Sequence, residues 1–119
     1  MDPKKIYIRK ISKDLRITMP INLVDDLRDG YIMLGDNKSL RIINKSQLQE
    51  IRERFDQETD DNTKRALAFL IRQSIQFSMD NRNRFKISLM HKNYIGAKDF
   101  VSITKIDNFI EVSAKNEKD

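Results

Sequence analysis

Two arginines, Arg16 and Arg84, stand at matching places in two similar stretches of the sequence. Each follows a short polar run, SKDL or DNRN, and opens a segment in which apolar and polar residues alternate as in a half-buried β-strand. A planar guanidinium can bind a phosphate, or the O6/N7 edge of guanine, through two hydrogen bonds, which a lysine cannot do equally well. A backbone fixed where a turn meets a strand also lowers the entropy lost on binding. Both arginines are therefore candidates for direct contact with DNA.

Other polar residues around these arginines have predicted supporting roles. Ser12 and Asp80 open the two polar runs, four residues before each arginine, and are expected to orient it. An internal ion pair between Asp80 and Arg84 is compatible with DNA contact, because a carboxylate that orients an arginine also prepares it for binding. The remaining candidates are predicted phosphate contacts, which give salt dependence but little sequence choice, with a solvated surface as the alternative for each: Arg9, Lys10, Lys13, Arg82 and Lys86.

Charge is segregated along the chain. The 119 residues carry 23 Lys and Arg against 18 Asp and Glu, a formal charge of +5. Residues 4–18 have a net charge of +5 and residues 80–92 have +3, whereas residues 50–61 have −4. This arrangement favours a protein with one side that faces a polyanion and a solvated back.

The composition argues against catalysis and against cofactors. The chain has no cysteine, which excludes disulfides and thiolate chemistry, and three glycines, too few for a phosphate-binding loop. His91 is the only histidine, and we expect it at the surface or at a subunit contact. The acidic run 56–61 lacks calcium-loop spacing, and Asp80 is not expected to bind a metal. No apolar run approaches the roughly 18 residues of a membrane span, so we expect a soluble, intracellular protein without enzyme activity, small-molecule substrate, cofactor or membrane partner.

The order of predicted elements suggests one α+β domain built from two repeats. The first repeat, about residues 4–45, has strands near 6–11 and 16–19, a short helix over 20–27, and a hairpin of 31–35 and 39–43. The second, about residues 74–114, has strands at 74–79 and 84–88, a short helix over 89–95, and a hairpin of 100–104 and 109–113. Residues 115–119 form a predicted disordered tail.

A helical connector, about residues 46–73, separates the repeats. Ser46 and Gln49 form a predicted capping box at the start of its first helix. The acidic run 56–61 is a predicted loop, and the second helix is expected to begin at Asn62 or Thr63. We expect this helical pair to cap a barrel-like core that strands from both repeats form together, with the basic turns on one side.

The two repeats can be aligned by a constant shift. A shift of 68 places Ser12 on Asp80 and Arg16 on Arg84, and one further residue then places Tyr31 on Phe100 and Leu40 on Phe109. Residue identity is slight, but the order of elements and the phase of the apolar residues recur. The chain is thus predicted to contain two pseudo-repeated β-turn-β-helix-hairpin units.

This duplication resembles the MraZ family, within the AbrB/MazE-like group of swapped-hairpin DNA-binding proteins. The family motif, D-x-x-x-R followed by alternating apolar residues and usually proline, occurs twice. The second copy here reads DNRNR, the first reads SKDLR followed by ITMP, and IDNFIEVSAK resembles the closing hairpin. The likeness extends over about residues 6–114.

The sequence departs from the family pattern at five positions. Ser12 stands where aspartate is expected, Leu15 and Asn83 where glycine usually precedes the arginine, Ser88 at the second proline, and Ser113 at a tryptophan. Asparagine tolerates a left-handed backbone and leucine does not, so we expect Asp14 to take the unusual angles in the first turn. Because Ser12 cannot form a charged pair with Arg16, we expect the second turn to dominate base recognition and the first to contribute phosphate contacts.

The resemblance implies a double-split, swapped-hairpin β-barrel in a cytoplasmic, nucleoid-associated transcriptional regulator. Such a protein binds repeated double-stranded DNA elements upstream of division and cell-wall genes and assembles into a ring of many subunits. A simple twofold dimer is the alternative assembly. The alternative function is an antitoxin-like or other protein-interaction module of the same fold, which the residues at positions 12 and 15 keep open. Candidate residues for a subunit seam are Ile21, Val24, Tyr94 and Ile95.

Overall fold

The computed structural model describes residues 5–25 and 27–115, and in them the chain forms a mixed α+β fold, as predicted. The first half contains β1 (Tyr7–Lys10), β2 (Arg16–Thr18), α1 (Ile21–Val24), β3 (Asp29–Leu34) and β4 (Leu40–Ile43). The connector contains α2 (Lys45–Gln57) and α3 (Asp61–Gln73). The second half contains β5 (Ile75–Ser78), β6 (Arg84–Lys86), α4 (Leu89–Ile95), β7 (Phe100–Ile106) and β8 (Phe109–Lys115).

Lys115 ends β8, so the predicted disordered tail begins too early by at least this residue. Residue 4 of the predicted first repeat and residues 116–119 of the predicted tail lie outside the described residues.

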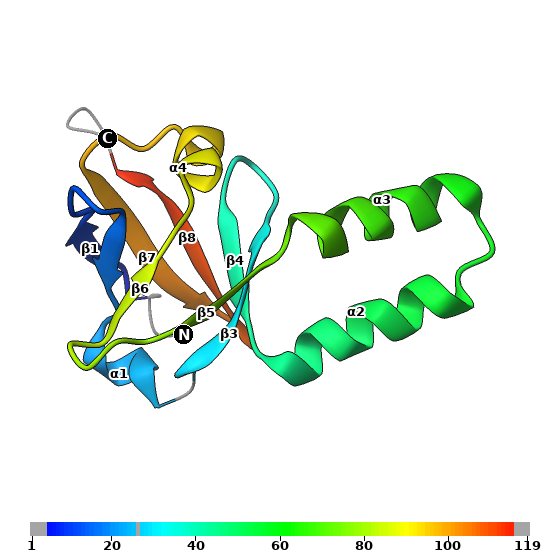
Figure 1. The fold of residues 1–119 in the computed structure, drawn as a ribbon, viewed down its shortest axis with the longest axis horizontal. Helices are drawn as coiled ribbons and strands as arrows, with labels where there is room; N and C mark the ends of the chain where they lie inside the picture. The colour runs from blue at the N-terminus through cyan, green and yellow to red at the C-terminus, as the bar shows by residue number, and fades with distance from the viewer. Residues whose placement is uncertain (1–4, 26, 116–119) are drawn as a thin grey trace.

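The two halves are interleaved in one sheet (Figure 1). Among the described residues, six strands form an antiparallel sheet in the order β1-β7-β8-β4-β3-β5, while β2 and β6 pair separately as a two-stranded ribbon. The first strand of each half therefore pairs with the hairpin of the other half: β1 with β7, and β5 with β3. Because of this exchange, neither half carries a complete sheet of its own.

Hydrogen bonds across the ribbon repeat with the predicted shift of 68. The backbone N–H of Met19 donates to the carbonyl of Asn83 at 2.8 Å, and the N–H of Ile87 donates to the carbonyl of Leu15 at 2.9 Å. These two bonds exchange when each residue is replaced by its counterpart in the other half. The turns and ribbon strands of the two halves are thus structural equivalents.

The predicted shift through the hairpins is wrong. Strand pairing makes Phe100 the counterpart of Asp29 and Ile110 the counterpart of Leu40, which correspond to shifts of 71 and 70. The sequence alignment instead placed Leu40 on Phe109. The difference arises because α4 has 7 residues and α1 has 4, so the second half gains three residues before its hairpin.

The main core lies between the ribbon and one face of the sheet. Ile17 of β2 and Phe85 of β6 are paired opposite each other and have no exposed surface. They pack with apolar residues of both hairpins, including Ile32 and Ile103. Full burial of such side chains contributes about 1.5–3 kcal/mol each, which fixes the ribbon on the sheet.

The helix ends of the connector differ from the prediction. Asn44, not Ser46, caps α2: its side chain accepts a hydrogen bond from the N–H of Gln47 at 2.8 Å, and the Gln47 side chain accepts one from the N–H of Asn44 at 2.9 Å. Asp60 caps α3 by accepting from the N–H of Thr63. The helices consequently occupy part of the predicted acidic loop, since asparagine and aspartate are strong N-caps.

The helical pair projects from the sheet and does not cap the main core as predicted (Figure 1). Its base packs on the other face of the sheet, where Met33 and Ile43 contact Leu48 of α2. The rest of α2 and α3 extends away from the ribbon, which lies on the opposite side of the molecule. No helix within residues 5–25 and 27–115 is long and apolar enough to cross a membrane.

Several predicted surface residues are buried. Val24 and Ile95 belong to the main core, so they cannot form the predicted subunit seam, whereas Ile21 is 77% exposed and Tyr94 is partly exposed. His91 is also fully buried, so its predicted surface position is wrong. It lies four residues before Ile95 on the inward side of α4, a spacing that places both residues on one helix face.

Candidate nucleic-acid interface

The β2–β6 ribbon presents one basic face. Arg16 pairs with Lys86, and Thr18 pairs with Arg84, in antiparallel register. Because side chains alternate along a strand, these four residues share the face opposite the core. Diagonal neighbours on one face of a sheet lie about 7–8 Å apart, which places Arg16 and Arg84 within reach of one ligand.

Turn 2, residues 80–84, fixes Arg84 through a single carboxylate. The Oδ1 atom of Asp80 accepts hydrogen bonds from the N–H groups of Arg82 and Arg84, both at 2.9 Å. Its Oδ2 atom accepts from Nε of Arg84, also at 2.9 Å, which forms an ion pair. The N–H of Asn83 closes the turn on the carbonyl of Asp80 at 3.0 Å. The ion pair considered from the sequence is therefore present.

Turn 1, residues 12–16, has the same backbone bonds with different side chains. The N–H of Leu15 donates to the carbonyl of Ser12 at 3.0 Å, and the N–H of Ser12 donates to the carbonyl of Arg16 at 2.9 Å. The Ser12 hydroxyl accepts from the N–H of Arg16 at 2.9 Å and donates to Oδ1 of Asp14. Oδ2 of Asp14 accepts from Nη1 of Arg16 at 2.9 Å.

One expectation for turn 1 is wrong, and the reason given for a second no longer holds. Leu15 itself takes the left-handed conformation, with φ of 65°, whereas Asp14 does not. The counterpart in turn 2 is Asn83, with φ of 58°, so both turns need a left-handed residue at the same place. Arg16 also has a charged partner, Asp14, which removes the reason for assigning it to phosphate contact alone.

Hydrogen bonds and charge keep both turn carboxylates ionised. The N–H of Arg84, followed by the N–H of Arg82 and the Arg84 guanidinium, lowers the pKa of Asp80 below its ordinary value. The Ser12 hydroxyl is the main cause of the lowered pKa of Asp14, and the charges of Arg16 and Arg84 add to it. The influence of Arg84 on Asp14 reflects how near the two halves of the ribbon are to each other.

The other predicted cations divide into two groups. Lys13 and Arg82 lie exposed in the two turns, beside Lys86 on the outer face of the ribbon. Arg9 and Lys10 lie on β1, at the edge of the main sheet. Nη1 of Arg9 donates to the carbonyl of Ile8 at 2.9 Å, and its guanidinium lies 5.6 Å from the ring centre of Tyr7. The ribbon thus gathers three of these cations near Arg16 and Arg84, while the other two lie along a neighbouring strand.

Two residues of this surface were missed in the sequence. Thr18 shares the outward face of the ribbon, and strand alternation from Arg16 could have placed it there. Asp14 holds Arg16, and a carboxylate two residues before an arginine in a tight turn was the available signal. The part of the chain that the structure describes contains no group of three or more His, Cys, Asp or Glu residues placed to hold a metal ion.

The fold and site together define an interleaved α+β protein with a two-stranded basic ribbon opposite a projecting helical pair. No protein-family model matches the chain. It is similar to the transcriptional regulator MraZ of Corynebacterium jeikeium (strain K411), with 25% identity over 126 residues that cover 95% of this chain and 87% of the relative. This similarity supports membership of the MraZ family.

Proposed function

We propose that the chain is a cytoplasmic, nucleoid-associated member of the MraZ family that regulates transcription by binding double-stranded DNA. The observation that carries this proposal is the outward face of the β2–β6 ribbon, where Arg16, Arg84 and Lys86 lie together on a rigid, buried base. The similarity to a transcriptional regulator is independent support.

A two-stranded ribbon has dimensions that suit DNA recognition. The major groove of B-DNA admits a two-stranded β-ribbon, and each base pair presents a distinct pattern of donors and acceptors there. In this proposal the ribbon enters the groove, and Arg16 and Arg84 bind base edges or the adjoining phosphates. Because Ile17 and Phe85 anchor the ribbon from below, little order has to be gained on binding.

The surrounding cations would contact phosphates. Lys13 and Arg82 extend from the two turns, and Lys86 lies on the ribbon, while Arg9 and Lys10 follow β1 beside it. Ser12 and Asp80 act by orienting the arginines. Each phosphate that such a group neutralises makes the logarithm of the binding constant fall with the logarithm of salt concentration, with a slope of about −0.9 per contact.

We also propose that each subunit is a swapped-hairpin barrel and that several subunits assemble into a ring. The ring would bind repeated elements upstream of division and cell-wall genes. Ile21 on α1 and Leu89 on α4 are equivalent under the shift of 68, and they are 77% and 60% exposed. Two unlike apolar surfaces on one chain can meet head to tail, and such contacts close into a ring when the rotation permits. Avidity then rises by about 10²–10⁴ where DNA sites have matching spacing.

Light scattering coupled to size exclusion tests the assembly, at micromolar concentration without DNA. We expect a mass of many chains, and replacement of Ile21 and Leu89 by serine should reduce it. A mass of one or two chains for the unsubstituted protein would contradict the ring and favour a monomer or a twofold dimer.

A protein-interaction module is the second candidate. Ile6, Ile8 and Phe100 lie at the β1–β7 edge and are 65%, 42% and 41% exposed, which favours contact with another protein. Selection of bound fragments from the host genome, followed by a salt titration on the enriched duplex, separates the two functions. Enrichment of one sequence with steep salt dependence supports the DNA-binding regulator. Absence of enrichment, together with a stable complex with a toxin-like protein, would support the interaction module.

A further inference from the structure

The two turns hold their arginines by different edges of the guanidinium. Asp80 binds Nε of Arg84, and Nη1 and Nη2 of that side chain have no hydrogen-bond partner among the described residues. Asp14 binds Nη1 of Arg16, which leaves Nε and Nη2 without a partner in the same residues. Each arginine therefore keeps one pair of neighbouring donors for a ligand. In Arg84 this pair is Nη1 and Nη2, at the end of the guanidinium; in Arg16 it is Nε and Nη2, along one side.

The different edges follow from where each carboxylate lies. In turn 2, Asp80 accepts from the N–H of Arg84 with one oxygen and from its guanidinium with the other. In turn 1, two side chains share these tasks: the Ser12 hydroxyl accepts from the N–H of Arg16, and Asp14 accepts from its guanidinium. The hydroxyl also donates to Asp14, so the three groups form one connected network.

Moving the carboxylate changes how charge is distributed over the surface of the turn. Under the shift of 68, Asp14 is the counterpart of Arg82, so an anion stands in turn 1 where an exposed cation stands in turn 2. The side chain of Asp14 is 51% exposed, whereas that of Asp80 is 28% exposed. Both turns have a net charge of +1, since Lys13 and Arg16 stand against Asp14, and Arg82 and Arg84 against Asp80. The turns therefore differ in where the carboxylate lies and how exposed it is, not in total charge.

We propose that Asp14 is a positioning and specificity-determining residue of the DNA-binding surface. It presents the Nε–Nη2 edge of Arg16 to a base, so that turn 1 selects sequence through a different pair of donors from the Nη1–Nη2 pair of Arg84. This inference rests on the proposed function.

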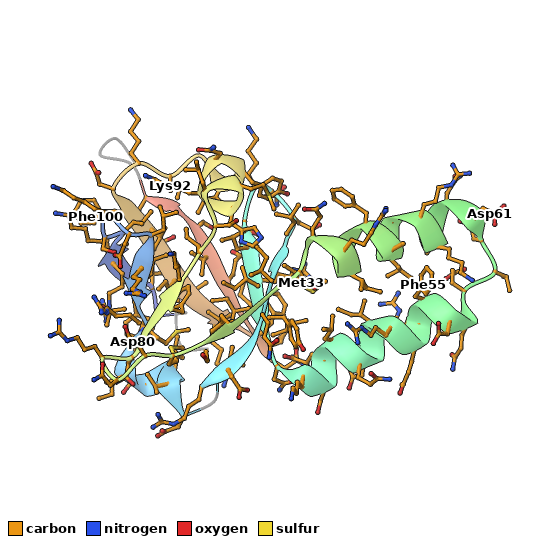
Figure 2. The ribbon with its side chains drawn as sticks, viewed as in Figure 1. Met33, Phe55, Asp61, Asp80, Lys92 and Phe100 are labelled. Carbon is orange, nitrogen blue, oxygen red and sulfur yellow. The ribbon has the colours of Figure 1, made fainter. Side chains whose placement is uncertain are left out.

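The test compares Asp14→Asn with Asp56→Asn in the full chain. Asp56 is an exposed aspartate of α2, next to Phe55 on the helical pair and far from the ribbon, and its replacement changes the net charge equally (Figure 2). Fluorescence anisotropy would measure affinity for an enriched duplex and for a scrambled duplex of the same length. We expect Asp14→Asn to lower the ratio of the two affinities about fivefold or more, since oriented arginine–base contacts carry discrimination of at least that size. Binding to the scrambled duplex should strengthen, with a salt slope steeper by up to about 0.9.

A double variant separates the edge that is presented from the presence of a charged partner. Ser12→Asp combined with Asp14→Asn moves the carboxylate to the position that Asp80 holds in turn 2, where it would bind Nε of Arg16 and leave Nη1 and Nη2 for the ligand. We expect this variant to bind the enriched duplex without recovering the lost discrimination, which a merely structural role of Asp14 would not predict. Thermal unfolding of all variants identifies any loss of fold.

The outcomes separate a failure of the proposed role of Asp14 from a failure of the proposed DNA binding. Discrimination that is the same in Asp14→Asn and Asp56→Asn would overturn the role of Asp14 while leaving DNA binding intact. A loss of affinity for both duplexes in equal proportion would also overturn it, as would full recovery of discrimination in the double variant. Absence of salt-sensitive binding by the unsubstituted chain would overturn the proposed function itself.

Discussion

Turn 1 and turn 2 have the same backbone hydrogen bonds but hold their arginines with different side chains. The closing N–H bonds are 3.0 Å long in both turns, and each turn has a left-handed residue before its arginine. Turn 2 uses the single carboxylate of Asp80, whereas turn 1 divides its tasks between Ser12 and Asp14. The comparison shows that the loss of a motif aspartate need not remove the ion pair it supports, because a hydroxyl can link the backbone to a carboxylate two residues away.

The short helices that follow the turns differ in a similar way. Pro20 precedes α1 without a side-chain cap, whereas Ser88 caps α4 by accepting from the N–H of His91 at 3.0 Å. Under the shift of 68, His91 is the counterpart of the buried Leu23. The second half thus places an ionisable ring where the first half has an aliphatic side chain.

The largest expected effect on stability is at His91, where the two halves differ in this way. Burial lowers the pKa of His91 below its ordinary value of 6.5; the nearby carbonyl of Gln73 offsets this only in part, and neither ring nitrogen has a hydrogen bond of normal geometry within the described residues. The unfolded chain therefore binds a proton that the native chain does not. Stability is fully present above pH 6.5 and falls as the pH decreases, by up to about 1.4 kcal/mol per pH unit.

His91→Leu, which copies the first half, should remove this slope. Urea unfolding at several pH values between 7 and 5 checks it, and attribution is direct because the chain has no other histidine. Asp14 and Asp80 do not interfere, since their lowered pKa values, from 3.8, confine their loss of stabilisation to lower pH. Equal slopes in the two proteins would contradict a buried neutral imidazole.

A smaller effect on stability is expected at the left-handed residue of each turn. Asn83 has φ of 58°, which asparagine tolerates and leucine does not, so Asn83→Leu should reduce the free energy of unfolding by about 1 kcal/mol. The reciprocal Leu15→Asn should gain less than this, because Leu15 also packs partly against the core. Asn81→Leu, in the same turn but outside the left-handed region, is the matched control. If Asn83→Leu and its control unfolded at the same urea concentration, the turn would not be constrained as described.

The sequence predicts the two faces of β2 and β6 because alternation and polarity are local signals, but it does not predict that these strands pair. Ile17 and Phe85 lie inward, and Arg16 and Arg84 outward, as the period of two requires. The exchange of first strands between the halves has no local signal, since it depends on which hairpin each strand meets. The position of the projecting helical pair likewise depends on the small contact of Met33 and Ile43 with α2.

Other errors arose where two local signals competed. Asn44 and Ser46 are both good helix caps, and each has a glutamine three residues later; the structure uses Asn44 with Gln47. At turn 1 the preference of leucine against positive φ was outweighed by the turn geometry, because packing holds Leu15 in place. A single histidine in a polar chain suggested the surface, but the helix face shared with Ile95 determined its burial.

Binding of DNA by the ribbon arginines is tested most directly by fluorescence anisotropy of the enriched duplex with Arg16→Ala, Arg84→Ala and the unsubstituted chain at fixed salt. We predict that each substitution weakens specific binding by about 1–3 kcal/mol while thermal unfolding stays unchanged. Arg84→Ala should have the larger effect on affinity and Arg16→Ala the larger effect on discrimination. Unchanged affinity in both variants, with folded protein, would contradict the account.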